Sequence, residues 1–113
     1  MSEPLQFKIE VFEGPLELLL HLISKHKLNI NDIPIAQLLE QYLDYLAQMQ
    51  SMDLEITSEF LAMAAQLVYI KTVSLLPRHE EAEELKKQLQ GQLLQYDLCQ
   101  RIAKQMGAKY QGN

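Results

Sequence analysis

The sequence is poor in cysteine, in long apolar runs and in positive charge, and each scarcity excludes a class of protein. Its one cysteine, Cys99, cannot form an internal disulfide, so we expect a reducing compartment and a buried, unreactive thiol. No apolar run reaches the roughly 18 residues that cross a bilayer. The N-terminus also lacks the basic region and apolar stretch of a secretory signal. The sequence therefore predicts a cytoplasmic protein with no membrane partner.

The charge balance argues against direct binding to nucleic acid. Ten lysines and arginines stand against fifteen aspartates and glutamates, which gives a formal net charge of −5. Binding to a phosphate backbone depends on clustered cations, whereas the basic residues here are scattered from Lys8 to Lys109. We therefore expect a protein partner.

Glycine is scarce too, and the motifs of common active sites are missing. Neither GxGxxG nor GxxxxGK[ST] occurs, so no phosphate-binding loop is expected. His79-Glu80 begins like a zinc-protease motif, but Glu83 stands where the second histidine is needed. The sequence predicts no catalytic, cofactor or metal site and a protein that is not an enzyme. A metal-dependent hydrolase that uses the His79–Glu84 cluster is the enzymatic alternative.

The few glycines and prolines divide the chain into segments with helical periodicity. Helices are predicted at about 15–27, 33–51, 58–76 and 79–107. Pro15 suits the first turn of the first helix. We expect Asn31 or Asp32 to cap the second helix, and Thr57 or Ser58 to cap the third.

Outside these helices, residues 7–12 alternate apolar and polar side chains, which predicts a short strand or extended arm. The expected fold is all-α: a small bundle of three helices plus this arm, followed by a long fourth helix. The expected organisation is a domain at 1–77, a long helix at 78–108 and a disordered tail at 109–113.

The predicted helix at 58–76 is apolar on nearly every side. One stripe centres on Leu61, Ala65, Val68 and Leu75, and a neighbouring stripe on Met63, Leu67 and Ile70. Either this is a central helix whose apolar surface the chain buries by itself, or helices of another protein cover one of its stripes. Because so small a chain has little material to cover a third face, the second reading is preferred.

The predicted helix at 79–107 carries a seam with coiled-coil spacing. Leu85, Leu89 and Tyr96 belong to it, and Leu94, Leu98 and Ile102 form another stripe. We expect this helix to dock on a partner, with the Leu85–Leu89–Tyr96 seam as the candidate surface.

Six stretches of the sequence form a recognisable series: FEGPLELLLHLI at 12–23, DIPI at 32–35, QYLDYL at 41–46, EFLAMAA at 59–65, IK at 70–71 and LLP at 75–77. In their order and spacing, over about residues 7–77, they resemble the N-terminal domain of segregation and condensation protein A, the bacterial kleisin. Thr72-Val73-Ser74 departs from the family pattern, so a contact there is expected to differ.

The resemblance implies a role that the residues alone do not give. Kleisins bridge the two heads of an SMC ATPase dimer, and their N-terminal helical domain docks on the coiled-coil neck of one subunit. The central segment of the family binds segregation and condensation protein B, and a C-terminal winged-helix domain binds the other head. Without these later parts, the 113 residues are not expected to bridge two heads alone.

The expected function is therefore a non-enzymatic subunit of the bacterial SMC complex, in the cytoplasm and associated with the chromosome through that complex. On this reading Leu61, Ala65, Val68 and Leu75 face the core of the domain. The residues expected to face the neck are Met63, Gln66, Leu67, Ile70 and Ser74, with Tyr45 from the preceding helix. The expected partners are the SMC ATPase and segregation and condensation protein B, with no cofactor. The alternative is a helical protein that associates with copies of itself.

Overall fold

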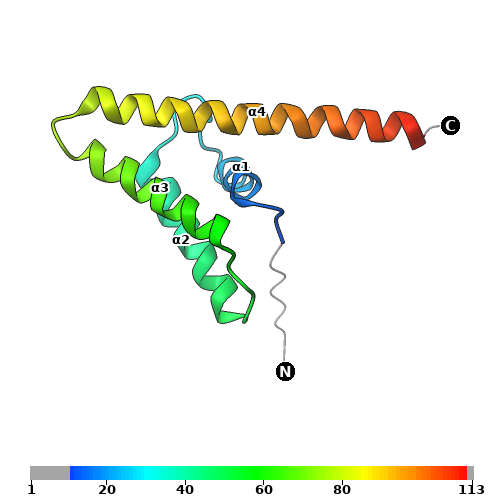
Figure 1. Cartoon of the computed structure of the whole chain (residues 1–113), viewed down its shortest axis with the longest axis horizontal. Helices are drawn as coiled ribbons and strands as arrows, with labels where there is room; N and C mark the ends of the chain where they lie inside the picture. The colour runs from blue at the N-terminus through cyan, green and yellow to red at the C-terminus, as the bar shows by residue number, and fades with distance from the viewer. Residues whose placement is uncertain (1–10, 112–113) are drawn as a thin grey trace.

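The computed structural model of the protein describes residues 11–111 and contains four α-helices in this range. They are α1 (Pro15–Lys25), α2 (Ile35–Ser51), α3 (Ser58–Ser74) and α4 (His79–Gln111). The first three form a bundle, and α4 crosses one end of it and continues well beyond (Figure 1). No residue of the described range lies in a β-strand. The predicted all-α class, a small bundle followed by a long fourth helix, is confirmed.

The helix starts follow local chemistry, with one correction. α1 begins at Pro15, whose missing N–H costs nothing in the first turn. α2 starts at Ile35, later than predicted, and its N-cap is Pro34 instead of Asn31 or Asp32. The ring of Pro34 disfavours helical backbone at the preceding residue, so the helix cannot begin before it.

α1 and α2 end in the same motif. Lys27 follows α1 with a φ of 55°, and Asp53 follows α2 with a φ of 60°. In both places the next N–H donates to the carbonyl five residues earlier, over 2.8 Å after Lys27 and 2.9 Å after Asp53. This is the Schellman arrangement, in which glycine is the usual left-handed residue. Both turns form here with larger side chains, which carry a steric cost in that conformation.

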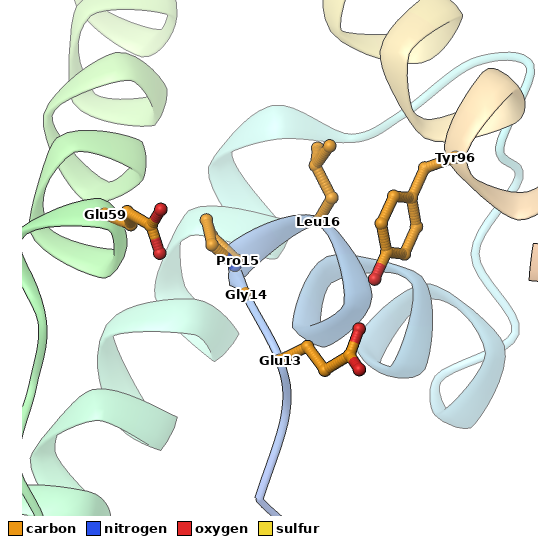
Figure 2. A pocket seen from close by; sticks show the side chains of 6 residues that line it. All are labelled: Glu13, Gly14, Pro15, Leu16, Glu59 and Tyr96. Atoms are coloured by element: carbon orange, nitrogen blue, oxygen red, sulfur yellow. The ribbon is translucent and has the colours of Figure 1, made fainter.

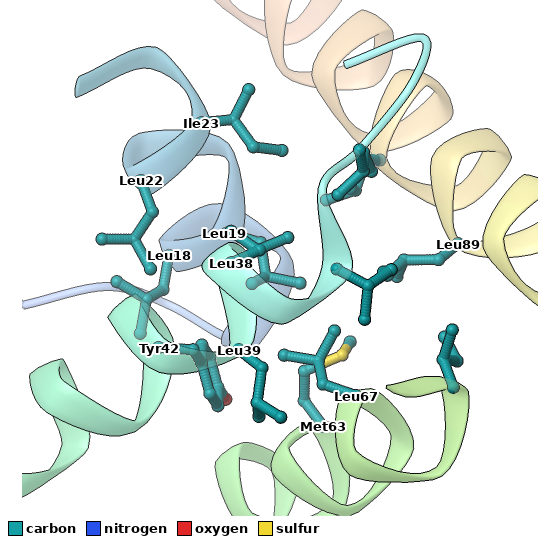
Figure 3. Close-up of a cluster of buried hydrophobic side chains, with 14 of the residues drawn as sticks. Leu18, Leu19, Leu22, Ile23, Leu38, Leu39, Tyr42, Met63, Leu67 and Leu89 are labelled. Carbon is teal, nitrogen blue, oxygen red and sulfur yellow. The ribbon is translucent and has the colours of Figure 1, made fainter. Parts of the chain in front are cut away.

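The hydrophobic core lies where the four helices meet (Figure 3). All of its fully buried large side chains are apolar or aromatic. Each helix contributes, with Leu18 and Leu19 from α1, Leu38 and Tyr42 from α2, Leu67 and Ile70 from α3, and Leu89 and Leu93 from α4. Because α4 supplies two of these side chains, its first part packs into the same core as the predicted domain at 1–77.

Tyr42 is the polar anchor of this core. Its hydroxyl donates a hydrogen bond to the carbonyl of Phe60 over 2.9 Å, which ties α2 to the first turn of α3. The side chain is fully buried, and this burial raises the pKa of Tyr42 above its ordinary value. The tyrosine therefore remains neutral and keeps its hydrogen bond at physiological pH.

Two polar contacts also hold α4 against the segment that precedes α2. The backbone N–H of Ile33 donates to Gln90 Oε1 over 3.2 Å, and Lys86 Nζ lies 3.1 Å from Asp32 Oδ1. Burial alone lowers the pKa of Lys86, but the hydrogen bond to Asp32 and the charges of Glu83 and Asp32 outweigh it, so the pKa is raised. Asp32 thus serves as the ion-pair partner of α4 and not as a helix cap.

The C-terminal end of the described chain differs from the prediction. α4 continues through Gln111, into the segment 109–113 that was expected to be disordered; residues 112–113 lie outside the described range, as do residues 1–10. Of the predicted arm at 7–12, the structure describes the last two residues. Val11 is exposed, whereas the ring of Phe12 lies 5.0 Å from that of His21 and 5.7 Å from that of Tyr45.

Candidate partner-docking surface

α3 carries two apolar stripes, and the structure buries the one that was predicted to face a partner. Met63, Leu67 and Ile70 are at most 7% exposed and belong to the core. The prediction that they face outward is wrong. The physical reason is volume, because these long side chains fill the space between α1, α2 and α4 to the density that a protein interior requires. Ala65 and Val68 at the middle of the other stripe have smaller side chains, which would leave cavities there.

The opposite stripe of α3 is exposed to solvent. Leu61 is 55% exposed, Val68 44% and Leu75 77%, and Ala65 and Thr72 between them are exposed as well. The prediction that this stripe packs into the core is therefore also wrong. Successive members are four, three, four and three residues apart, which is the spacing of the a and d positions in a coiled coil. We call these five residues the outer face of α3; Leu75 is the C-cap that directly follows the helix and keeps helical backbone angles.

Tyr69 and Lys71 border the outer face on opposite edges, since helical geometry turns each successive residue by about 100°. Tyr69 is half exposed, and its hydroxyl donates to Glu81 of α4 over 3.2 Å. Lys71 is exposed. It is the only charged residue between Phe60 and Pro77. The outer face is thus an apolar surface with a single cation at its border.

The other predicted contacts on α2 and α3 do not join this surface. Helical spacing places Gln66 and Ser74 on the core side of α3. Gln66 is half-buried, and the Ser74 hydroxyl donates to the Ile70 carbonyl over 2.8 Å. Tyr45 is half-buried on α2, where its ring packs against Phe12. The six residues predicted to bind the neck therefore do not form one exposed surface.

The seam predicted on α4 faces its own bundle. Leu89 is fully buried, and Leu85 and Tyr96 are half-buried on the same side. The prediction that Leu85, Leu89 and Tyr96 present a surface to a partner is wrong, because this seam closes the core over α1 and α3. The apolar side chains of α4 that remain exposed lie on another stripe.

This second stripe begins on the outer side of the packed part of α4 and continues onto the part that leaves the bundle. Its members are between 43% and 57% exposed and follow each other at every fourth position: Leu94, Leu98, Ile102 and Met106. We call them the outer stripe of α4. Cys99 beside it is exposed, contrary to the predicted buried thiol, because its position lies outside the packed side of the helix.

Tyr96 anchors α4 on the start of α1 (Figure 2). Its hydroxyl accepts a hydrogen bond from Gln100 Nε2 over 3.0 Å, and the same nitrogen lies 3.5 Å from Glu17 Oε2. Burial, and then the charges of Glu17 and Glu13, raise the pKa of Tyr96. A hollow of about 330 Å³ beside it is lined by Glu13, Gly14, Pro15, Leu16, Glu59 and Tyr96. These contacts extend the junction of α4 with the bundle as far as Gln100.

The enzymatic alternative rests on the His79–Glu84 cluster, which lies at the exposed start of α4. His79, Glu80, Glu83 and Glu84 of this cluster line a hollow of about 430 Å³ together with Lys87. In residues 11–111 no three histidine, cysteine, aspartate or glutamate side chains are placed to hold a metal ion. Within that same range, no helix combines the length and the apolar character of a membrane span.

Comparison with known proteins identifies the family. The family model for segregation and condensation protein ScpA matches residues 22–109. A segregation and condensation protein A from Streptococcus mitis is 42% identical over 111 residues, which cover 95% of this chain and 46% of the relative. The proteins of the same name from Bacillus cereus strain AH187 and Bacillus anthracis strain A0248 are each 40% identical over 114 residues, or 93% of this chain and 46% of the relative. The chain thus spans about half the length of these curated relatives, and it belongs to the segregation and condensation protein A family.

Proposed function

We propose that this chain is a non-enzymatic subunit of a bacterial SMC complex and that the outer face of α3 docks on the head-proximal coiled coil of an SMC ATPase. Its relatives are named for segregation and condensation, and we propose the same role for this chain. The protein would act in the cytoplasm, on the chromosome, through the SMC complex. The observation that carries the proposal is an exposed apolar stripe with coiled-coil spacing on α3.

The chemistry of the stripe favours a coiled coil over an irregular partner surface. Residues spaced alternately by four and three insert as knobs between the side chains of a facing helix. In two-stranded coils the flanking positions are usually charged. On one edge of the stripe the flanking residues are Ala62, Tyr69 and, after the end of α3, Leu76, whereas Ala64 and Lys71 flank the other edge. An apolar flank supports contact with two helices at once, as when α3 lies in the groove of a two-stranded coil.

Docking on a partner would also remove exposed apolar side chains from water, which is energetically favourable. Leu61, Val68 and Leu75 are exposed by 44% to 77%, and covering each contributes on the order of 1 kcal/mol. Exposed apolar side chains that line up on one helix mark interaction surfaces more often than isolated ones do. The outer face therefore gains stability when a neighbouring coil covers it.

We propose the outer stripe of α4 as the surface for segregation and condensation protein B. This stripe begins beside the buried Leu93 and continues through Ile102 and Met106, which lie beyond the last contact of α4 with α1 at Gln100. The end of α4 extends past the bundle, away from α3 (Figure 1). Because the two surfaces belong to different helices, α3 and α4, we expect one chain to bind both partners at the same time.

Two matched leucine variants test both assignments. Leu61 on α3 is 55% exposed and Leu98 on α4 is 57% exposed, so a glutamate at either position meets a similar environment in the free chain. We expect Leu61→Glu to lose binding to an SMC head that carries its adjoining coil and to keep binding to segregation and condensation protein B. Leu98→Glu should show the reverse. Calorimetric titration measures both affinities, and circular dichroism checks that each variant is folded.

Two results would contradict these assignments. If Leu61→Glu binds the SMC fragment as tightly as the unmodified chain, the outer face of α3 is not the docking surface. If both variants lose both partners while staying folded, the surfaces are not separate. The alternative function, self-association through these same stripes, requires a mass in sedimentation that rises with protein concentration in the absence of any partner.

A further inference from the structure

We propose that Lys71 sets the direction and register in which the partner coil lies on the outer face of α3, by pairing with a carboxylate on that coil. This inference rests on the proposed docking of α3 on a coiled coil. It adds a specificity-determining residue and states one property of the partner, an acidic residue that flanks its contact seam opposite Lys71.

The apolar residues of the outer face do not define a direction by themselves. Leucines lie at both ends of the face, Leu61 and Leu75, and Val68 lies at its middle, so the order of its large apolar side chains is the same from either end. Ala65 and Thr72 fill the positions between them and differ by a methyl and a hydroxyl group. A coil packed on this pattern meets nearly the same knobs in either orientation. Apolar contacts therefore supply affinity but little discrimination between the two directions.

Lys71 breaks this symmetry. It lies on one edge of the outer face in its C-terminal half, and the equivalent position one heptad earlier is Ala64. It is exposed. The stretch from Phe60 to Leu76 contains no other charge. A partner carboxylate can therefore pair with α3 at one end of the face and not at the other.

The surroundings of Lys71 leave its charge available. A hollow of about 500 Å³ lies beside it, between the start of α2, the end of α3 and the start of α4. The other lysine of this hollow, Lys86, is already paired with Asp32 at 3.1 Å and with Glu83 at 3.6 Å. Within residues 11–111 no ion pair involves Lys71. It is thus the cation of the hollow that remains for a partner.

A rim charge of this kind acts mainly on specificity and on the rate of association. Opposite charges across an interface speed the encounter and fix the register, and like charges penalise the wrong arrangement. Coulomb attraction at a solvated rim is screened by salt, since the Debye length is about 8 Å at physiological ionic strength. The contribution of Lys71 should therefore be large at low salt and small at high salt.

The test compares two charge reversals in the full chain. We expect Lys71→Glu to weaken binding to an SMC head with its adjoining coil by roughly tenfold at low salt, mostly through the association rate. Lys104→Glu changes the net charge equally but lies on the exposed end of α4, and it should bind the SMC fragment like the unmodified chain. Reversal of each acidic residue of the coil to lysine, one at a time, should identify a single position that restores binding to Lys71→Glu.

The outcomes separate this inference from the proposed function. Three results together support the role of Lys71. Lys71→Glu binds the SMC fragment more weakly at low salt, this defect disappears at high salt, and a charge reversal at one position of the coil restores binding. If Lys71→Glu binds normally while Leu61→Glu does not bind, the docking surface stands and the role of Lys71 is overturned. Rescue by no coil position also overturns it. If Leu61→Glu itself binds normally, the proposed docking of α3 is contradicted, and the inference about Lys71 is contradicted with it.

Discussion

Leu61 and Leu67 lie six residues apart on α3 and have opposite environments. Leu67 is fully buried among the other helices, whereas Leu61 is 55% exposed on the outer face. The cost of removing a buried leucine combines the lost transfer free energy with the cavity that remains. A leucine at the surface leaves no cavity when it is shortened. The two positions therefore report which stripe of α3 is inside.

We predict that Leu67→Ala lowers the free energy of unfolding by about 3 kcal/mol and that Leu61→Ala changes it by less than about 0.5 kcal/mol. Urea titration followed by circular dichroism measures both values, and the same helix provides the control. Equal losses in the two variants would show that both stripes are buried, which would remove the argument for a docking surface.

A second residue-level prediction concerns Tyr42. Tyr42→Phe removes its hydrogen bond to the Phe60 carbonyl and should cost about 1 kcal/mol at neutral pH. The folded-state pKa of Tyr42 is raised above the ordinary value of 10.0. Above that pH the unfolded chain loses the proton and the folded chain retains it, so the stability of the unmodified chain declines as pH rises.

Urea midpoints between about pH 8 and about pH 11 measure this decline. It should be shallower in Tyr42→Phe, which has no proton to lose at this position. Some decline should remain in Tyr42→Phe, because the pKa of Tyr96 is raised as well and its titration also lowers stability at high pH. A decline of unchanged steepness in the variant would show that the hydroxyl of Tyr42 is not buried.

At the scale of elements, α4 is a continuous helix of 33 residues, about 50 Å long at 1.5 Å per residue. Gly91 interrupts its sequence but not its structure. A Cβ added at Gly91 meets no atom within 4 Å, so neither packing nor an unusual turn requires glycine there. The position carries only the conformational entropy cost of glycine in a helix.

Gly91→Ala should therefore stabilise the chain by about 1 kcal/mol. Thermal and urea unfolding measure the gain, and Gln92→Ala, an exposed neighbour on the same helix, should give a change of a few tenths of a kcal/mol. A loss of stability in Gly91→Ala would mean that the chain needs a bend at this position, contrary to the straight packing of α4 on α1 and α3.

At the scale of the whole molecule, the domain boundary expected after Pro77 does not divide the packing. Leu89 and Leu93 of α4 are fully buried in the core that α1, α2 and α3 share. Gln90 and Lys86 add polar contacts to the segment before α2. The part of α4 beyond Gln100 has exposed side chains as far as Met106. The folding unit thus includes roughly the first two-thirds of α4.

Two truncations follow from this division. A chain that ends after residue 101 should keep the unfolding midpoint of the full chain within experimental error. A chain that ends after residue 77 should lose several kcal/mol, because two fully buried leucines are removed and their partners are exposed to water. Circular dichroism and thermal melting measure both. A fully stable fragment 1–77 would instead support the predicted domain at 1–77.

Much of the fold follows from local patterns that the sequence displays. Proline positions and apolar periodicity predicted the four helices, with most ends within two residues. The predicted resemblance to the segregation and condensation protein A family is confirmed by the family comparison. These features depend on neighbouring residues, through steric limits at proline, first-turn chemistry and the alternation of apolar side chains.

The orientation of the stripes was decided only by tertiary packing. α3 has two apolar stripes of similar hydrophobicity, and local periodicity does not choose between them. Leu89 and Leu93 come from a segment that lies twenty or more residues further along the chain than Leu67, and with α1 and α2 they enclose the stripe with the larger side chains. The sequence alone thus determined that α3 had apolar surface to cover; the arrangement of the four helices decided which side stays open to a partner, because burial depends on long-range contacts that no local pattern contains.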